Sequence, residues 1–141
     1  MLLPDTNLLL NAVHADSAQH DLARKTLEDM LADPRGMALT WVVLMGFMRL
    51  STKRGILPSP LDVAEVLGIV DEWLAHPRVR VLEPGPLHAG IFGRLLLSAG
   101  TAGNLMTDAH IAAIAIEHQA DVLTFDRDFA SFAGLRSQLL S

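Results

Sequence analysis

The sequence of 141 residues contains no cysteine, which excludes disulfide bonds and cysteine-ligated metal sites. Its six histidines also lack the spacing of a zinc site. His110 and His118 are eight residues apart and His14 and His20 are six apart, so neither pair lies one turn apart on a helix. The metal ligands that remain are hard oxygen atoms, chiefly those of carboxylates.

Long apolar runs are missing as well. No apolar stretch approaches the roughly 20 residues that a membrane-spanning helix requires. The opening segment MLLPDTNLLL has no basic residues before its apolar run, and Pro4 and Asp5 interrupt that run, so a secretory signal is not indicated. We therefore expect a soluble cytoplasmic protein that has no contact with membranes.

Charge is scarce and mostly negative, at 19% charged residues and a net charge of −5 at pH 7. This balance argues against broad affinity for nucleic acids, because phosphates attract Lys and Arg. It still permits an enzyme that meets phosphates through a metal ion. Half of the residues are hydrophobic, which fits one domain over residues 1–141 with a real core. So high an apolar content also predicts an oligomer or a bound partner that covers surface.

Short apolar segments alternate with segments of helical periodicity along the whole chain. Strands are expected at Met1–Pro4, Ala38–Leu39, Val79–Leu82 and Asp121–Thr124. Helices are expected at Leu8–Ala12, Ala18–Leu31, Trp41–Leu50, Leu61–Leu74, Leu87–Ser98 and Thr107–His118, with a loop or one helical turn at Asp126–Phe132. Short strands between helices predict an α/β protein whose parallel sheet is covered on both faces.

Three aspartates stand where a buried element meets a loop. Asp5 follows the first strand, Asp126 follows the last, and Asp108 lies in the first turn of a helix that is apolar nearly all round. Taken singly, each has a simpler explanation, since aspartate also caps helices and forms turns. Together they indicate more, because a parallel sheet brings its carboxyl ends together and neighbouring buried carboxylates require a cation. The pattern predicts a magnesium-type site for phosphate chemistry.

Two motifs carry a resemblance to a known family. They are Asp5-Thr6-Asn7 near the start and the later run Asn104…Asp108-Ala109-His110…Ala113…Asp126-Arg127-Asp128-Phe129. With these motifs about a hundred residues apart, the chain resembles the PIN-domain ribonucleases and, more narrowly, the VapC toxins of bacterial toxin–antitoxin pairs. The resemblance implies a three-layer α/β/α sandwich with a short central parallel sheet and RNA cleavage that depends on Mg²⁺ or Mn²⁺. It also implies a homodimer that a cognate VapB antitoxin inhibits, alone or within a larger toxin–antitoxin complex.

The resemblance assigns roles to single residues. Asp5, Asp108 and Asp126 match the catalytic, metal-binding aspartates of the family, and Asp128 matches a further metal-binding position. Thr6 and Asn104 match polar positions of the family that lie near the site and support its metal-binding residues.

Contact with RNA also requires positive charge near the site. The candidates are Arg49, Lys53, Arg54 and Arg127. Lys53 and Arg54 are equally well explained as solvated surface charges, and Arg49 as a member of a structural ion pair.

One position departs from the family. Its members usually carry a glutamate in the helix at Trp41–Leu50, at the position that is Gly46 here, and no acidic residue occurs from Thr40 to Lys53. Losing a carboxylate should weaken cation binding, although Mg²⁺ needs only one or two carboxylates and a water molecule could fill the gap. The alternative is a degenerate PIN domain that binds RNA or an antitoxin without cutting.

Two other enzyme classes begin with a strand followed by an aspartate. Phosphatases of the haloacid-dehalogenase type require a second aspartate two residues on, where this chain has Asn7. Receiver domains of two-component signalling carry an acidic pair at the end of the first strand, whereas Asp5 has no acidic neighbour.

Overall fold

The computed structural model describes residues 1–55, 57–100, 103 and 105–141. Asn104, predicted to support the site, lies outside the described residues. The strands are β1 (Leu2–Pro4), β2 (Met37–Leu39), β3 (Val79–Val81), β4 (Asp121–Thr124) and β5 (Ser137–Leu139). The helices are α1 (Thr6–Val13), α2 (His20–Ala32), α3 (Trp41–Thr52), α4 (Val63–Ala75), α5 (His88–Ala99), α6 (Met106–His118) and the 3₁₀ helix η1 (Arg127–Ser131).

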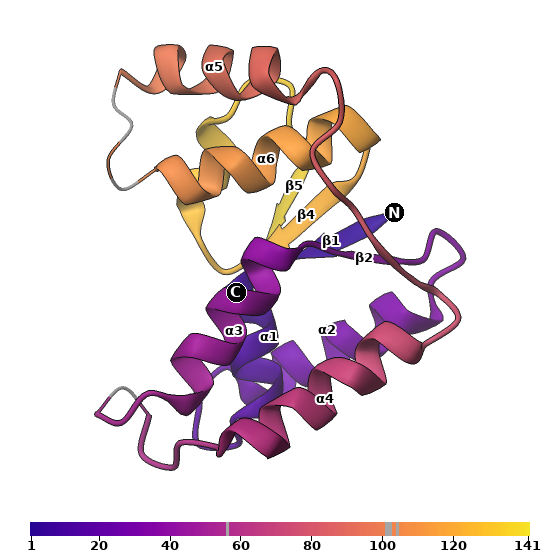
Figure 1. Ribbon diagram of the computed structural model, residues 1–141, viewed down its shortest axis with the longest axis vertical. Helices are drawn as coiled ribbons and strands as arrows, with labels where there is room; N and C mark the ends of the chain where they lie inside the picture. Colours follow the sequence, from indigo (N-terminus) through magenta and orange to yellow (C-terminus); the bar gives the residue numbers. More distant parts are fainter. Residues whose placement is uncertain (56, 101–102, 104) are drawn as a thin grey trace.

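The five strands form one parallel sheet in the order β3-β2-β1-β4-β5. Along the chain, β2 and β3 are added on one side of β1, and β4 and β5 are then added on its other side. Because crossovers between parallel strands are right-handed, this reversal places the helices on opposite faces. Figure 1 shows α1 to α4 on one side of the strands and α5 and α6 on the other. The result is the three-layer α/β/α sandwich that the sequence predicts.

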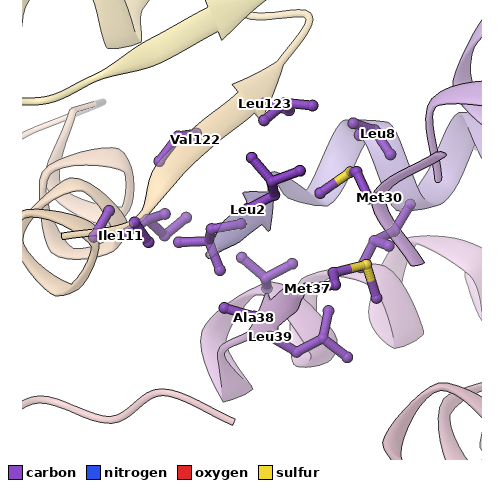
Figure 2. Packing of buried hydrophobic residues seen from close by; sticks show 14 of the residues in the cluster. Leu2, Leu8, Met30, Met37, Ala38, Leu39, Ile111, Val122 and Leu123 are labelled. Carbon is purple, nitrogen blue, oxygen red and sulfur yellow. The ribbon is translucent and has the colours of Figure 1, made fainter. Parts of the chain in front are cut away.

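The core lies on both faces of the central strands. All residues of β1 and β2 are buried, as are the last three of β4, whereas the edge strands β3 and β5 are largely exposed. Leu2 of β1 pairs with Met37 of β2, and Leu3 of β1 pairs with Val122 of β4. Figure 2 shows Leu2, Met37 and Val122 among the buried side chains of these strands. Ile111 of α6 covers one face and Leu8 of α1 the other, so the central strands are fixed from both sides.

Several boundaries differ from those that the sequence predicts. α1 begins at Thr6 rather than Leu8, because Asp5 is its N-cap. The strand β5 was not predicted: its Ser-Gln-Leu sequence is exposed and carries no buried strand pattern. None of the helices that the structure describes combines the length and apolar character needed to cross a membrane.

Candidate active site

The site lies at the carboxyl ends of β1 and β4, the two strands between which the chain changes direction across the sheet. Leu3 pairs with Val122 and Pro4 with Leu123, so Asp5 and Thr124 follow side by side at this edge. Open α/β sheets form a crevice at this kind of reversal, and their ligands bind there. The fold therefore places the first and last motifs of the sequence next to each other.

Asp5 is held rigidly at the end of β1. It is 5% exposed, its Oδ1 accepts a hydrogen bond of 2.7 Å from the Thr6 N–H, and its Oδ2 accepts one of 2.8 Å from the Thr124 hydroxyl. The same Thr124 oxygen accepts a 2.9 Å hydrogen bond from the Asp126 N–H. Thr124 therefore connects the two aspartates and fixes the distance between their chain segments.

Asp126 and Asp128 are positioned by the start of η1. Asp126 is the N-cap of this helix, and its Oδ1 accepts a 2.9 Å hydrogen bond from the Asp128 N–H. Asp108 reaches the same place from the first turn of α6, whose N-terminus lies at this edge of the sheet. Carboxylate oxygens of Asp108, Asp126 and Asp128 lie within 4.8 Å of one another. We call these three residues the aspartate cluster.

A cavity of about 670 Å³ opens beside the aspartate cluster. Asp5 and Asp108 line it from one side, and Val42, Met45, Gly46, Arg49 and Leu50 of α3 line it from another. The remaining lining residues are Thr6, Asn7, Leu10, Thr107 and Ile111. Only Asp108 belongs both to the cavity and to the aspartate cluster, so it stands at the junction of the two.

Burial and mutual repulsion make the carboxylates of the site weaker acids. The pKa of Asp108 is raised to about 7, first by burial and then by the negative charges of Asp5, Asp126 and Asp128. Burial also raises the pKa of Asp5, against the opposing effect of its hydrogen bonds from Thr124 and Thr6. A site in which a carboxyl group keeps its proton near neutral pH is one where a cation would relieve the repulsion.

The side chains present fit a divalent cation of the hard type. They offer three carboxylates within 4.8 Å of one another, and oxygen-only donors are what Mg²⁺ and Mn²⁺ prefer. Asp5 lies outside this close group but contributes its charge, since it raises the pKa of Asp108. The structure thus gathers all four predicted aspartates at one edge of the sheet and brings three of them within reach of one ion.

The raised pKa of Asp108 predicts how the stability of the metal-free protein depends on pH. Between about pH 4 and pH 7 the folded protein holds a proton that the unfolded chain has lost, so the free energy of unfolding falls as pH rises through this window. Because Asp108 is only half-buried, solvent screening limits its share to about 1–2 kcal/mol. Urea unfolding in EDTA at several pH values measures it.

Asp108→Asn is the matched variant, since it removes the titrating group and keeps the shape. The pH dependence should become shallower in this variant, leaving the smaller share of Asp5. Adding Mn²⁺ to the unaltered protein should restore stability above pH 7, where the ion replaces the lost proton. Equal slopes for the variant and the unaltered protein would contradict the raised pKa.

Gly46, which replaces the usual glutamate, is in close contact with Thr6. A Cβ atom at position 46 would lie 3.1 Å from Thr6 Cγ2 and 3.2 Å from Thr6 Oγ1. The Thr6 side chain, rather than open space for water, therefore stands next to the backbone of Gly46. The absence of a side chain at position 46 lets α3 approach α1 closely.

This contact predicts that the effect of a side chain at position 46 depends on Thr6. Gly46→Ala should lower the free energy of unfolding by about 1–2 kcal/mol, because both branches of the stiff Thr6 side chain are in its way. In a Thr6→Ala background the same change should stabilise by up to about 1 kcal/mol, the gain in helix propensity. Chemical unfolding of the four proteins gives the coupling. The same effect in both backgrounds would refute the close contact.

The predicted RNA-binding residues occupy different places. Arg49 lines the cavity, whereas Lys53 and Arg54 are exposed beyond the end of α3 and do not line it. Arg127 is exposed on η1, between Asp126 and Asp128. Arg49 is therefore the cation of this group that shares the cavity with Asp5 and Asp108.

Two polar residues of the site were not predicted as such. Thr124 links Asp5 to Asp126, and the Asn7 side-chain oxygen accepts a 3.4 Å hydrogen bond from the Phe125 N–H. Both tie the segment after β1 to the segment after β4. The available signal for Thr124 was a polar residue ending an otherwise apolar strand just before an acidic motif.

Comparison with known proteins agrees with this geometry. Residues 2–135 match the PIN domain family. Ribonuclease VapC37 of Mycobacterium tuberculosis is 39% identical over 136 residues, covering 96% of this chain and 94% of the relative. Ribonuclease VapC33 of the same species is 40% identical over 136 residues, covering 96% of this chain and 95% of the relative.

Solved structures share the fold at low sequence identity. VapBC2 from Rickettsia felis, bound to a DNA fragment from its promoter, superposes with a TM-score of 0.72 at 19% identity, over 99% of this chain and 98% of that one. Mycobacterium tuberculosis VapC20, a toxin that cleaves the sarcin–ricin loop, gives 0.69 at 18% identity, over 96% of this chain and 99% of that one. The family match and the relatives at about 40% identity show that the chain belongs to the PIN-domain family and, within it, to the VapC ribonucleases.

Proposed function

We propose that this protein is the toxin of a type II toxin–antitoxin pair and an endoribonuclease that depends on Mg²⁺, with Mn²⁺ as a substitute. The observation that carries the proposal is the aspartate cluster at the edge of the cavity, in a chain about 40% identical to named ribonucleases. PIN-domain nucleases generally use divalent metal ions, and this cluster offers the ligands for one.

In this proposal Asp108, Asp126 and Asp128 hold the ion, and the charge of Asp5 strengthens the negative field around it. A divalent ion bound there supplies positive charge, which makes water a better nucleophile and offsets the charge that develops on a phosphodiester. Either Asp126 or Asp128 orients the attacking water and accepts its proton. Thr6 and Thr124 keep the Asp5 carboxylate in place through their hydrogen bonds.

The proposed partner that restrains the enzyme is a VapB-type antitoxin. Several proteins of the same fold were solved as VapBC complexes, including those of Rickettsia felis and Salmonella typhimurium. The apolar wall of α3 offers a surface for such a partner, since Trp41 and Met45 are 46% and 55% exposed. We also propose a homodimer, which the family resemblance implies and the high apolar content of the chain supports.

The exposed pair Lys53 and Arg54 tests whether RNA extends beyond the cavity. Reversing both charges with Lys53→Glu and Arg54→Glu should weaken RNA binding and reduce its salt dependence, because each lost phosphate contact lowers the logarithmic slope by about 0.7. Reversal of Arg24 and Lys25, an exposed pair on α2, is the matched control. Fluorescence anisotropy at several salt concentrations measures the slope. An unchanged slope would exclude this pair as an RNA contact.

The proposed function is tested by incubating the purified, antitoxin-free protein with total cellular RNA in Mn²⁺ or in EDTA and mapping the new RNA ends. We expect discrete new ends in Mn²⁺ and none in EDTA. A protein that binds RNA but produces no new ends and takes up no Mn²⁺ would be a non-cleaving PIN domain, the alternative that Gly46 suggests. Calorimetric titration with Mn²⁺ separates these two outcomes.

A further inference from the structure

One wall of the cavity has a charge opposite to that of the other. Asp5 and Asp108 line one side, while α3 contributes no acidic residue on the other. Val42, Met45, Gly46 and Arg49 are spaced three, four and seven residues from the first, so they lie on one helix face, and all four line the cavity. The α3 wall therefore carries one charge, and that charge is positive.

Gly46, where the family usually carries a glutamate, is tightly packed against a neighbouring side chain. A Cβ atom added at residue 46 would lie 3.1 Å from the Thr6 side chain, so the backbone of α3 packs directly against α1. Arg49 follows Gly46 by one helical turn. It is exposed, its side chain has no ion pair or hydrogen bond among the described residues, and the cavity is open in front of it.

We propose that Arg49 makes the α3 wall of the cavity a binding surface for an anion. It binds a phosphate group of the RNA, and the site holds a single divalent ion between Asp108, Asp126 and Asp128. This inference rests on the proposed function and adds to it the number of ions and the residue that anchors the substrate.

The charges of the two walls explain why one ion and one anion fit better than two ions. A second divalent ion at the α3 wall would have Asp5 and Asp108 on one side only and would lie beside the Arg49 guanidinium of the same wall, a repulsive arrangement. A phosphate there meets the guanidinium, whose planar set of donors matches phosphate oxygens in pairs. The far side of the same phosphate can then face the ion at Asp108.

The test combines two measurements that do not depend on turnover. The first is the number of Mn²⁺ ions bound per protomer, counted by calorimetry and by electron paramagnetic resonance. The second is the affinity for a fluorescein-labelled RNA oligonucleotide in EDTA, for the unaltered protein, Arg49→Met and Arg49→Lys. Arg24→Met is the control, because Arg24 is an exposed arginine on α2 that does not line the cavity.

We expect one Mn²⁺ per protomer in all four proteins. Arg49→Met should bind RNA at least about tenfold more weakly and with a salt slope lower by about 0.7, because one charge-assisted phosphate contact is lost. Arg49→Lys, which keeps the charge without the planar fork, should fall between, and Arg24→Met should match the unaltered protein.

Two Mn²⁺ ions per protomer, or unchanged RNA affinity in Arg49→Met, would overturn the inference. Tighter binding of Mn²⁺ by Arg49→Met with unchanged RNA affinity would also overturn the inference. It would show that Arg49 offsets the negative charge of the carboxylates and does not bind RNA. These results are separate from a failure of the proposed function. Mn²⁺-dependent cleavage combined with two bound ions would overturn only this inference and leave the nuclease assignment in place. Loss of RNA affinity in Arg49→Met, together with no cleavage by the unaltered protein, would overturn only the nuclease assignment.

Discussion

Asp108→Asn is expected to reduce RNA cleavage by at least about 1,000-fold while the protein stays folded. Asp108 belongs both to the aspartate cluster and to the cavity, so its loss removes a proposed ligand at the point where the proposed ion would meet the substrate. Removing one group that stabilises transition-state charge typically costs about 100- to 1,000-fold, and weaker binding of the ion adds to that loss. Initial rates on a defined RNA over a range of Mn²⁺ concentrations measure the effect.

The same variant has a stability signature that separates loss of chemistry from loss of fold. Replacing a repelled carboxyl group with an amide should leave Asp108→Asn at least as stable as the unaltered metal-free protein at pH 8. Asp121→Asn, which removes a carboxylate paired with Arg136 at the opposite edge of the sheet, is the matched control and should retain activity. Turnover of Asp108→Asn within tenfold of the unaltered protein would rule out Asp108 as a ligand.

The second large effect is expected at Thr124, which is buried and does not line the cavity. Thr124→Val keeps the shape of the side chain and removes the hydroxyl that donates to Asp5 and accepts from the Asp126 N–H. The buried Asp5 carboxylate and the half-buried Asp126 N–H then each lose a partner, which costs about 1–3 kcal/mol of stability. Groups that orient metal ligands change affinity or activity by about 10- to 100-fold, so cleavage and Mn²⁺ affinity should fall by that factor.

Thr124→Ser supplies the control because it retains the hydroxyl and loses one methyl group. It should keep activity within a few-fold of the unaltered protein and lose a small amount of stability. The comparison of the two variants isolates the hydrogen bonds from the packing of the strand. If Thr124→Val bound Mn²⁺ and cut RNA as well as Thr124→Ser, the link between Asp5 and Asp126 would have no part in positioning the site.

The strongest periodicities in the sequence were the reliable guides to the fold. Helix α6 was predictable within one residue because it is apolar nearly all round, and the central strands because they are short, apolar and followed by turn or cap residues. The end of α3 was not predictable. The sequence predicts that the helix ends at Leu50, but it continues through Thr52, and the buried Ser51 hydroxyl bonds to His14 Nε2 at 2.9 Å, 37 residues away. No local pattern reveals a contact of that range.

The charged residues of the site could be predicted from the sequence, whereas the contacts that Thr124 and Gly46 make could not. Asp5, Asp108 and Asp126 stand out in the sequence because each interrupts an apolar context. Thr124 does not stand out, because threonine is an ordinary strand residue and its role depends on the pairing of β1 with β4. The close contact of Gly46 with Thr6 likewise depends on how two helices pack, so the sequence revealed the missing carboxylate but not what stands in its place.

The pairing of β1 with β4 also governs when the enzyme can first act. The central strand β1 precedes the other strands of the sheet along the sequence, and β4, whose pairing with β1 completes the site with Asp126, comes only after β2 and β3. During synthesis the earlier helices can pack against β1 and β2, but the contacts of β1 with β4 form only after both strands exist. A nascent chain in which β1 has formed but β4 has not therefore carries Asp5 without Asp126, and the acidic site does not exist until both strands are paired.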